Sequence, residues 1–520
     1  MQPKRLLYLS HRWLGVLLCL FFAPWFISGV VMMYVGHPKL TAPERLAHLP
    51  ALTAPASLLS PQQALQAAGL GERVADLRLA VASAGQAVYL VTPAPTAAGA
   101  EQPKGKKGRR KADTVVVDAH SGQVLNAFDQ GAAMVSATAF MGGRTGLVYA
   151  GTVTEDAHTH SKALDPHRPL HLVHTGDADG TWLYVSSRTG EVVRDAPAVE
   201  RNWNYLGSWM HWLYPFRGNV FDPYWSDIVI WLSVAGTVVV LLGLVNGLLR
   251  WRFDGHYKSG SRSPYQSRMM RWHHVYGLLF CAISLTWVFS GLMSMNPWGV
   301  LNGGAPPGKT EAMQGGPLKV NGDFMAPTEI LQRNGNASVR ELQWLRLLRK
   351  DLVMVNGPHG MQQLLDARNG QPYVPTQDEI VTAAARLRSE PITEVALQRE
   401  ADFYYYSREP HTMSGGEKPL PVLRLAYADE HHTVAYVDPR TGSLVQQVDD
   451  ARRVRRWLFS LLHSWDWLPL LNHRPLWDVV MVGLSVGGTV ISLTSLVIGW
   501  RRLRTKARQW RAARRTPAMG

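Results

Sequence analysis

Four histidines at matching positions in two halves of the chain are the residues best placed to do chemistry. The N-terminal stretch "HRWLGVLLCLFFAPWFISGVVMM" aligns without a gap on a second stretch 262 residues later, which places His11 on His273. A second match, at an offset of 252 residues, places His211 on His463. Residues related by a pseudo-twofold axis can face one another across it. The sequence therefore predicts two histidine pairs, one near each surface of a membrane.

Two imidazoles suit one kind of metal centre in particular. Structural zinc sites prefer four protein ligands, whereas haem iron already has four macrocycle nitrogens and takes axial donors, usually imidazole. Glycines and tryptophans accompany the histidines and fit a flat aromatic group, although tight helix packing and an aromatic belt at the lipid surface are alternative roles. The glycines are Gly15, Gly29, Gly277 and Gly291, and the tryptophans are Trp13, Trp25, Trp209, Trp212, Trp272, Trp287, Trp457, Trp465 and Trp467.

Arginines near both histidine pairs could bind the carboxylates of a haem. Arg12 and Arg271 adjoin the first pair, and Arg456 lies in the run "RRVRR" that precedes the second. Arginine recognises carboxylates through two parallel hydrogen bonds. We therefore predict two haems whose propionates contact these three arginines. Setting the orientation in the membrane is a second role for Arg12 and Arg271.

Other histidines rank lower as ligands. His274 follows a member of the first pair, but the repeat places an arginine opposite it, so it is a second choice. His37 has a glycine at its counterpart and stays in reserve for the outer site. The remaining histidines lie among strand and turn signals, which favours ordinary exposed or strand positions over a metal-binding surface. They are His158, His160, His167, His171, His174, His431 and His432.

Four apolar segments of about 20 residues are long enough to cross a bilayer. They cover about 13–35, 226–249, 275–296 and 477–499, and basic residues cluster before the first, between the second and third, and after the fourth. By the positive-inside rule this side is the cytoplasm, so both termini are cytoplasmic and the two long segments lie outside. The net charge of +15 then reflects orientation and contact with membrane lipid, and no nucleic acid is expected.

Each half of the chain runs in the same order: a histidine-headed span, a long extracytoplasmic segment, an aromatic segment with a histidine, and a second span. Both copies start in the cytoplasm, which predicts an α-helical membrane protein with four transmembrane helices in two parallel repeats. In the long segments, strand-like runs end in Asp- or Ser-x-x-x-Gly turns, and capping residues precede helical runs such as "TQDEIVTAAARLR". We therefore expect two α+β extracytoplasmic domains, each with helices on an antiparallel sheet.

Domain boundaries follow from these patterns. A stretch at 93–113 that is rich in Ala, Pro, Gly and Lys reads as a solvated loop, with attraction of an anionic ligand as a second role. The expected units are transmembrane helix 1 at 1–36, the first α+β domain at 37–200, the histidine segment and transmembrane helix 2 at 201–251, a cytoplasmic loop at 252–271, transmembrane helix 3 at 272–296, the second α+β domain at 297–450, the histidine segment and transmembrane helix 4 at 451–500, and a basic tail at 501–520.

The chain resembles the PepSY-associated transmembrane family, which includes iron-regulated inner-membrane proteins and ferric-siderophore reductases of Gram-negative bacteria. The resemblance covers essentially the whole chain and rests on "HRWLG…SG", "HRPLHLV…GTWLYVSSRTGEV" and "RRWLFSLLHSWDWLPLLNHRPLWDVV". It implies a bacterial inner-membrane location with periplasmic PepSY-like domains. It also implies two haem b groups held by His11, His273, His211 and His463, and reduction of iron in a ferric siderophore or similar chelate, which frees Fe(II) in the periplasm.

The electron donor, the acceptor and two other functions stay open at this point. We expect no flavodoxin-reductase module of the kind fused to some relatives, so the expected donor is a separate cytoplasmic flavoprotein or a quinol. An anionic chelate would suit a basic lining formed by Arg452, Arg453, Arg455 and Arg456. One alternative is a PepSY-type regulatory or ligand-binding membrane protein without redox activity, which leaves the paired histidines unexplained. The other is a transporter of iron chelate or haem, although the spans lack Asp and Glu in their interiors.

Overall fold

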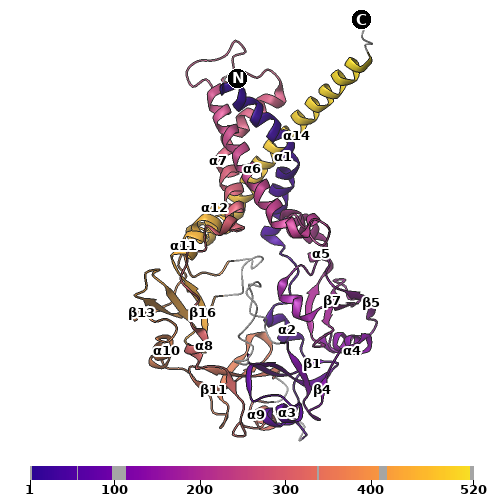
Figure 1. The fold of residues 1–520 in the computed structure, drawn as a ribbon, viewed down its shortest axis with the longest axis vertical. Coiled ribbons are helices and arrows are strands. Elements are labelled where there is room, and N and C mark those ends of the chain that lie inside the picture. The colour runs from indigo at the N-terminus through magenta and orange to yellow at the C-terminus, as the bar shows by residue number, and fades with distance from the viewer. Residues whose placement is uncertain (1–2, 55–56, 96–112, 336–338, 409–417, 516–520) are drawn as a thin grey trace.

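Four long helices form a bundle, and the β-sheets gather beyond one of its ends (Figure 1). The computed structural model describes residues 3–54, 57–95, 113–335, 339–408 and 418–515. The bundle consists of α1 (Pro3–Tyr34), α6 (Trp225–Arg250), α7 (Arg268–Ser294) and α14 (Leu476–Arg515). Each is long and apolar enough to cross a membrane, and each overlaps one of the four predicted spans. Both chain termini lie at the end away from the sheets (Figure 1).

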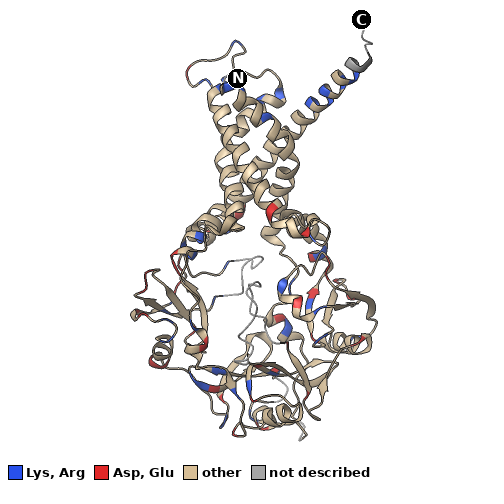
Figure 2. Cartoon of the chain, in the orientation of Figure 1, with Lys and Arg blue, Asp and Glu red and all other residues tan. Residues whose placement is uncertain are grey.

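Glycines let the bundle helices approach one another closely. A Cβ atom at Gly236 in α6 would lie 2.9 Å from Cγ1 of Val288 in α7, and one at Gly488 in α14 would collide with the Phe26 ring of α1. Small residues at such contacts pack membrane helices, for which lipid offers no hydrophobic driving force. Charged side chains are sparse along the bundle, and Lys and Arg gather at the end with the termini (Figure 2).

The largest sheet joins the two halves of the chain. Its eight strands run in the order β12-β11-β10-β1-β2-β3-β4, with β9 pairing with β1. At its centre β1 pairs antiparallel with β10 from the second half, with Leu77 opposite Trp344. The strands are β1 (Arg73–Ser83), β2 (Gln86–Pro93), β3 (Val115–Asp118), β4 (Val124–Leu125), β9 (Leu318–Lys319), β10 (Glu341–Leu347), β11 (Lys350–Asn356) and β12 (Gln362–Asp366).

This shared sheet corrects the expectation of two separate domains, each with a sheet of its own. The side chains of Tyr89 and Trp344 come from different halves and are both fully buried in the same core, with ring centroids 5.9 Å apart. Alternation of apolar residues along a strand shows which face is buried, but it does not show which neighbour the strand pairs with. The link between the halves was therefore invisible in the sequence pattern.

Each half also has a four-stranded antiparallel sheet of its own. The first consists of β5 (Val148–Val153), β6 (Leu170–His174), β7 (Trp182–Ser186) and β8 (Val192–Ala196), and the second of β13 (Ile392–Gln398), β14 (Val422–Tyr427), β15 (Val434–Val437) and β16 (Leu444–Val448). In Figure 1 these two sheets lie on opposite sides of the molecule, between the bundle and the shared sheet.

The predicted local signals for turns and helix caps are confirmed. Gly122, Gly190, Gly370 and Gly442 end the four x-x-x-Gly turns, and all four adopt a positive φ between 65° and 74°. Glycine suits this conformation because it has no Cβ atom. The run "TQDEIVTAAARLR" forms α10 (Gln377–Ala384) behind a capping box in which Thr376 and Glu379 exchange hydrogen bonds.

The remaining helices are short and connect the sheets to each other and to the bundle. They are α2 (Ala42–His48), α3 (Pro61–Ala67), α4 (Gln130–Phe140), α5 (Ala198–Asn204), α8 (Thr310–Gln314), α9 (Pro327–Arg333), α11 (Asp450–Arg455), α12 (Leu462–Ser464) and α13 (Leu468–Leu471). Short 3₁₀ turns occur at Lys162–His167, Tyr214–Phe216, Asp222–Tyr224, Pro297–Gly299 and Pro358–Gly360.

Two matching segments lead from the sheets back into the bundle. α5 continues into a π-helical turn at Tyr205–Trp209 just before His211. α11 continues into a π-helical turn at Arg456–Leu461, followed by α12, which carries His463. π-Helical turns are rare and are frequently found at functional sites. The fold therefore presents both histidines from the same kind of local structure, at the end of the bundle that faces the sheets.

Candidate functional site

Two cavities lie inside the bundle, one toward each end. The terminal cavity, named for the end where both chain termini lie, has a volume of about 270 Å³ and is lined by His11 and His273. The domain cavity, at the end that faces the sheets, has a volume of about 410 Å³ and is lined by His211 and His463. The structure thus brings the four predicted histidines to two cavities in the predicted pairs.

The terminal pair joins α1 and α7. The imidazole rings of His11 and His273 have centroids 6.3 Å apart and planes inclined by 29°. Nδ1 of His11 lies 3.0 Å from the carbonyl oxygen of Val239 in α6. Nδ1 of His273 lies 3.3 Å from the hydroxyl oxygens of both Thr494 and Ser495 in α14. Each ring is therefore held by a helix other than its own.

The domain pair is built in the same way from the two π-helical segments. The rings of His211 and His463 have centroids 5.9 Å apart and planes inclined by 78°. Nδ1 of His211 lies 3.0 Å from Oγ of Ser28 in α1, and Nδ1 of His463 lies 3.0 Å from Oγ of Ser290 in α7. The indole of Trp25 adds a hydrogen bond to the carbonyl oxygen of His211 at 3.0 Å.

These contacts leave Nε2 of each ring available to a metal. Within the described residues, no hydrogen bond engages Nε2 of His11, His273, His211 or His463. Metal-ligating histidines commonly engage the other ring nitrogen in this way, which fixes the tautomer and the ring orientation. Metal–imidazole bonds of about 2.0 Å, with ring atoms roughly 1.1 Å from the ring centre, put the centres of two opposed ligand rings about 6.2 Å apart. Both pairs have this spacing.

Burial keeps the domain pair neutral at pH 7. Desolvation lowers the pKa of His211 to about 4, partly offset by the backbone carbonyl of Trp25. Desolvation, together with the neighbouring His211, lowers the pKa of His463 to about 3. Neutral imidazole is the form that binds a metal. The site therefore favours coordination over a charged histidine.

The predicted glycines leave open space beside the histidines. A Cβ atom at Gly15 or Gly277, which both line the terminal cavity, would meet no heavy atom within 4 Å. In the domain cavity, Cβ atoms at Gly29 and Gly291 would meet only Cε1 of the neighbouring histidine, at 3.7 and 3.9 Å. A planar group between the rings would have room at all four positions.

The predicted tryptophans divide into two groups. Trp25, Trp212 and Trp287 line the domain cavity, together with Trp225, which was not predicted. Trp13 and Trp272, near the terminal pair, are 44% and 38% exposed and line neither cavity. The cavity-lining role therefore holds for Trp25, Trp212 and Trp287, whereas Trp209, Trp457, Trp465 and Trp467 line neither cavity. The exposed rings at the terminal end suit the lipid surface.

The sequence predicted the positions of the arginines less accurately than those of the histidines. Arg12 lines the terminal cavity, but Arg271 is exposed and lines neither cavity. Arg456 is buried and donates to the backbone carbonyls of Phe403 and Asp466 instead of reaching the domain cavity. Arg452 and Arg455 are exposed outside both cavities, and a basic lining at 452–456 for an approaching chelate stays a prediction. Three arginines that were missed line the cavities: Arg250 and Arg502 at the terminal end, and Arg408 at the domain end.

Two reserve histidines have other partners. His274 uses both ring nitrogens, with Nδ1 2.8 Å from Oγ of Ser263 and Nε2 2.9 Å from the carbonyl oxygen of Gly247. It therefore has no nitrogen left for a metal. His37 engages Oδ1 of Asn204 through Nδ1 at 3.0 Å and lines neither cavity. Desolvation lowers the pKa of His37 to about 4.

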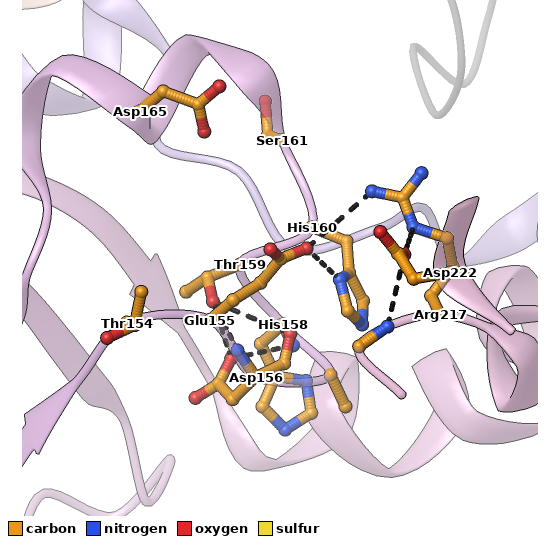
Figure 3. Close-up of polar contacts among 12 residues, drawn as sticks. Thr154, Glu155, Asp156, His158, Thr159, His160, Ser161, Asp165, Arg217 and Asp222 are labelled. Carbon is orange, nitrogen blue, oxygen red and sulfur yellow. Dashed lines mark hydrogen bonds and ion pairs between the residues drawn. The ribbon is translucent and has the colours of Figure 1, made fainter. Parts of the chain in front are cut away.

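The histidines of the first long segment serve the fold. Figure 3 shows Glu155 in contact with both His160 and Arg217, and Arg217 pairs in turn with Asp222. His171 accepts or donates hydrogen bonds at both ring nitrogens. Across the described ranges, no group of three or more His, Cys, Asp or Glu residues could hold a metal ion. Most of the basic stretch predicted at 93–113 lies outside the described residues.

Comparison of the sequence with family models and with curated proteins found no match. The chemistry of the site is therefore inferred from its geometry. Each cavity offers two imidazole donors to one metal ion, space for a planar group, and a largely apolar lining. Such a site suits a metal that brings most of its own ligands.

Proposed function

We propose that the chain is a membrane oxidoreductase that holds two haem b groups, one between His11 and His273 and the other between His211 and His463. One observation carries the proposal: both ring pairs have the spacing of opposed axial ligands, at 6.3 and 5.9 Å, while Nδ1 of every ring is engaged elsewhere. Two axial donors per site match what haem iron requires. The open space beside the glycines gives further support.

A haem bound at each pair would supply one-electron transfer. The chain's own residues hold the imidazoles in place, fix their tautomers and keep water out. On α1, Ser28 follows His11 by 17 residues, which is about 26 Å along a helix. The same spacing separates Ser290 from His273 on α7. Phe22 and Phe26 line both cavities and fill the space between the two sites with aromatic side chains.

The proposed direction of electron flow is from the terminal end to the domain end. We propose an inner-membrane location with cytoplasmic termini, periplasmic PepSY-like sheets and two parallel repeats. The basic residues at the terminal end (Figure 2) support this orientation, since positive loops stay in the cytoplasm. The electron reduces Fe(III) to Fe(II) in a ferric siderophore or similar chelate near the domain cavity, and the weaker hold of the chelate on Fe(II) frees it. A cytoplasmic flavoprotein or a quinol supplies the electron.

The lining of the cavities favours electron transfer over ion-coupled transport. Among the described residues, neither cavity is lined by Asp or Glu. Carboxylates inside a membrane commonly mark proton relays and ion pathways. Electron transfer between axially held metal centres needs no such group.

A visible absorption spectrum of the full-length protein in detergent tests the proposal. The expected result is a reduced b-type spectrum at two haems per chain. Alanine at His11 or His273 should remove one haem, and alanine at His211 or His463 should remove the other. His274→Ala is the matched control, since this residue lies beside the terminal pair with both nitrogens engaged. Protein produced with ample haem that shows no such bands would exclude the proposal.

The acceptor is tested separately. Dithionite-reduced protein, freed of excess reductant, is mixed with a ferric hydroxamate chelate and with a ferrous trap. The expected result is reoxidation of the b-type bands and one trapped Fe(II) per electron. Reoxidation that does not depend on the ferric chelate would contradict the choice of acceptor while leaving the haem assignment intact.

A further inference from the structure

Three arginines converge on the terminal cavity. Arg12 from α1, Arg250 from the end of α6 and Arg502 from α14 all line it. Arg250 and Arg502 are separated by the same offset of 252 residues that relates His211 to His463. Each half of the chain therefore contributes one arginine to the mouth of this cavity at an equivalent position.

The position of Arg250 is fixed by aromatic neighbours. Its guanidinium donates a hydrogen bond to the hydroxyl of Tyr265 at 3.1 Å. Its Cζ also lies 4.1 Å from the ring centroid of Tyr8. Arginine stacks on aromatic faces without losing its hydrogen-bond donors, so these contacts orient the fork and leave donors for a ligand.

No acidic side chain balances these charges. Across the described residues, no ion pair reaches Arg12, Arg250 or Arg502, and the residues that line the cavity include no Asp or Glu. The cavity also contains Asn246, which is 93% buried and whose Oδ1 has no hydrogen-bond partner. Nε of Arg502 is likewise buried without a partner. Unpaired charges and unsatisfied polar atoms are costly beside apolar walls, so this arrangement points to a ligand that is missing from the protein alone.

The domain cavity differs in this respect. Within the part of the chain that the structure describes, the arginine that lines it is Arg408, whose Nε lies 3.4 Å from Oδ1 of the Asp466 carboxylate. The hydroxyl of Tyr406 donates to the other carboxylate oxygen at 2.8 Å. The two cavities therefore match in their histidines and differ in their charge.

We infer that the mouth of the terminal cavity is an anion site in which Arg250 and Arg502 bind a pair of anionic groups, with Arg12 adding a third charge. One source of these groups is the two carboxylates of a haem held by His11 and His273. For this source the inference rests on the proposed function. The second source is the phosphate of a lipid head group, which offers the same chemistry of anionic oxygens.

The test compares haem with its dimethyl ester, in which both carboxylates are neutral. The full-length chain carrying His211→Ala and His463→Ala keeps only the terminal pair, and is titrated with each compound after production in haem-deficient cells. Arg250→Gln, Arg502→Gln and the double variant are measured beside Arg271→Gln, a control arginine that is exposed and outside the cavity. Phospholipid retained per chain is measured on the same samples.

If the haem carboxylates are the ligand, the chain should bind haem about tenfold or more tightly than the ester, because a hydrogen bond to a charged group contributes this much. The double variant should lose this preference and the control should keep it. If a lipid phosphate is the ligand, haem and ester should bind equally, and the double variant should lose phospholipid that the control retains. Equal binding of haem and ester with unchanged phospholipid would overturn the anion site.

The outcomes separate this inference from the proposed function. A bis-histidine spectrum in every variant, with no effect of the arginines, would overturn the anion site alone. The absence of any such spectrum would overturn the proposed function. Should the double histidine variant fail to accumulate, a redox titration of the protein with both histidine pairs decides instead. Arg250→Gln and Arg502→Gln should then lower the midpoint of one of two waves, and Arg271→Gln should lower neither.

Discussion

Alanine at Gly15 would show whether a planar group fills the terminal cavity. Gly15 lies one turn after His11 on α1, so both residues share the face that lines this cavity. A Cβ atom at Gly15 would meet no heavy atom of the protein within 4 Å. The protein alone therefore accommodates the methyl group, and alanine is favoured over glycine within a helix by about 1 kcal/mol.

A bound macrocycle changes this result. If it packs against Gly15, the added methyl group overfills the site, which typically costs about 1–3 kcal/mol. The expected affinity for the terminal haem is then lower by a factor of roughly five to more than a hundred. Gly277, its counterpart on α7, also has no heavy atom within 4 Å of a Cβ and should give the same loss.

The assay is the haem content of purified variants and their haem dissociation in the presence of an apoprotein acceptor. Gly483→Ala is the control, because this α14 residue also has open space around its Cβ but lines neither cavity. The expected result is normal expression of all variants and loss of one haem from Gly15→Ala and Gly277→Ala only. Full retention of both haems in these two variants would refute the idea that the group lies beside the glycines.

Four other variants provide three further tests of the structure. Ser28→Ala or Ser290→Ala removes the partner of a domain-pair Nδ1 and should weaken haem binding there by about 10- to 100-fold, read from haem loss on dilution, whereas unchanged retention would argue against that contact. Desolvation raises the pKa of Glu200 to about 7, above its value in the unfolded chain. The stability that the protonated carboxyl contributes is therefore lost as the pH rises through 7. The melting temperature should fall from pH 5 to pH 8, and Glu200→Gln should flatten this slope. Arg78→Met removes an ion-pair partner that Glu191 and Glu341 share. The free energy of unfolding in urea should fall by about 3–5 kcal/mol, and a change below 1 kcal/mol would contradict the ion-pair network.

The features that local sequence predicts well are those that depend on neighbouring residues. The four long helices follow from apolar length alone, and the turn at Gly442 follows from the need for a residue without a Cβ atom. The pairing of β1 with β10 escaped prediction because the two strands lie more than 250 residues apart and their alternation carries no information on the partner.

The candidate site likewise combines features that the sequence predicts with features that depend on distant contacts. The repeat predicted which histidines face one another, because the symmetry that duplicates a residue also duplicates its position. The repeat did not predict that both ring nitrogens of His274 engage in hydrogen bonds, one with Ser263 and one with Gly247. Those contacts depend on how a loop folds back onto α7. The positions of the arginine side chains were predicted least accurately, because a long side chain with many rotamers can point in several directions and backbone position alone does not fix the guanidinium. The matched offset of Arg250 and Arg502 was a signal that could have found them.

The two ends of the bundle combine equal ligands with unequal surroundings. Position 204 is Asn in the first half and its counterpart at 456 is Arg, so the first half has a side chain that hydrogen-bonds His37 where the second half has a buried guanidinium, and neither lines the domain cavity. At the terminal end, by contrast, Arg250 and Arg502 preserve the symmetry. Under the proposed function the axial ligands are the same at both ends, so any difference in reduction potential would come from nearby charge and hydrogen bonds. The positive charge of Arg250 and Arg502 would favour the reduced state at the terminal end, and carboxylates bound between these arginines would offset that effect.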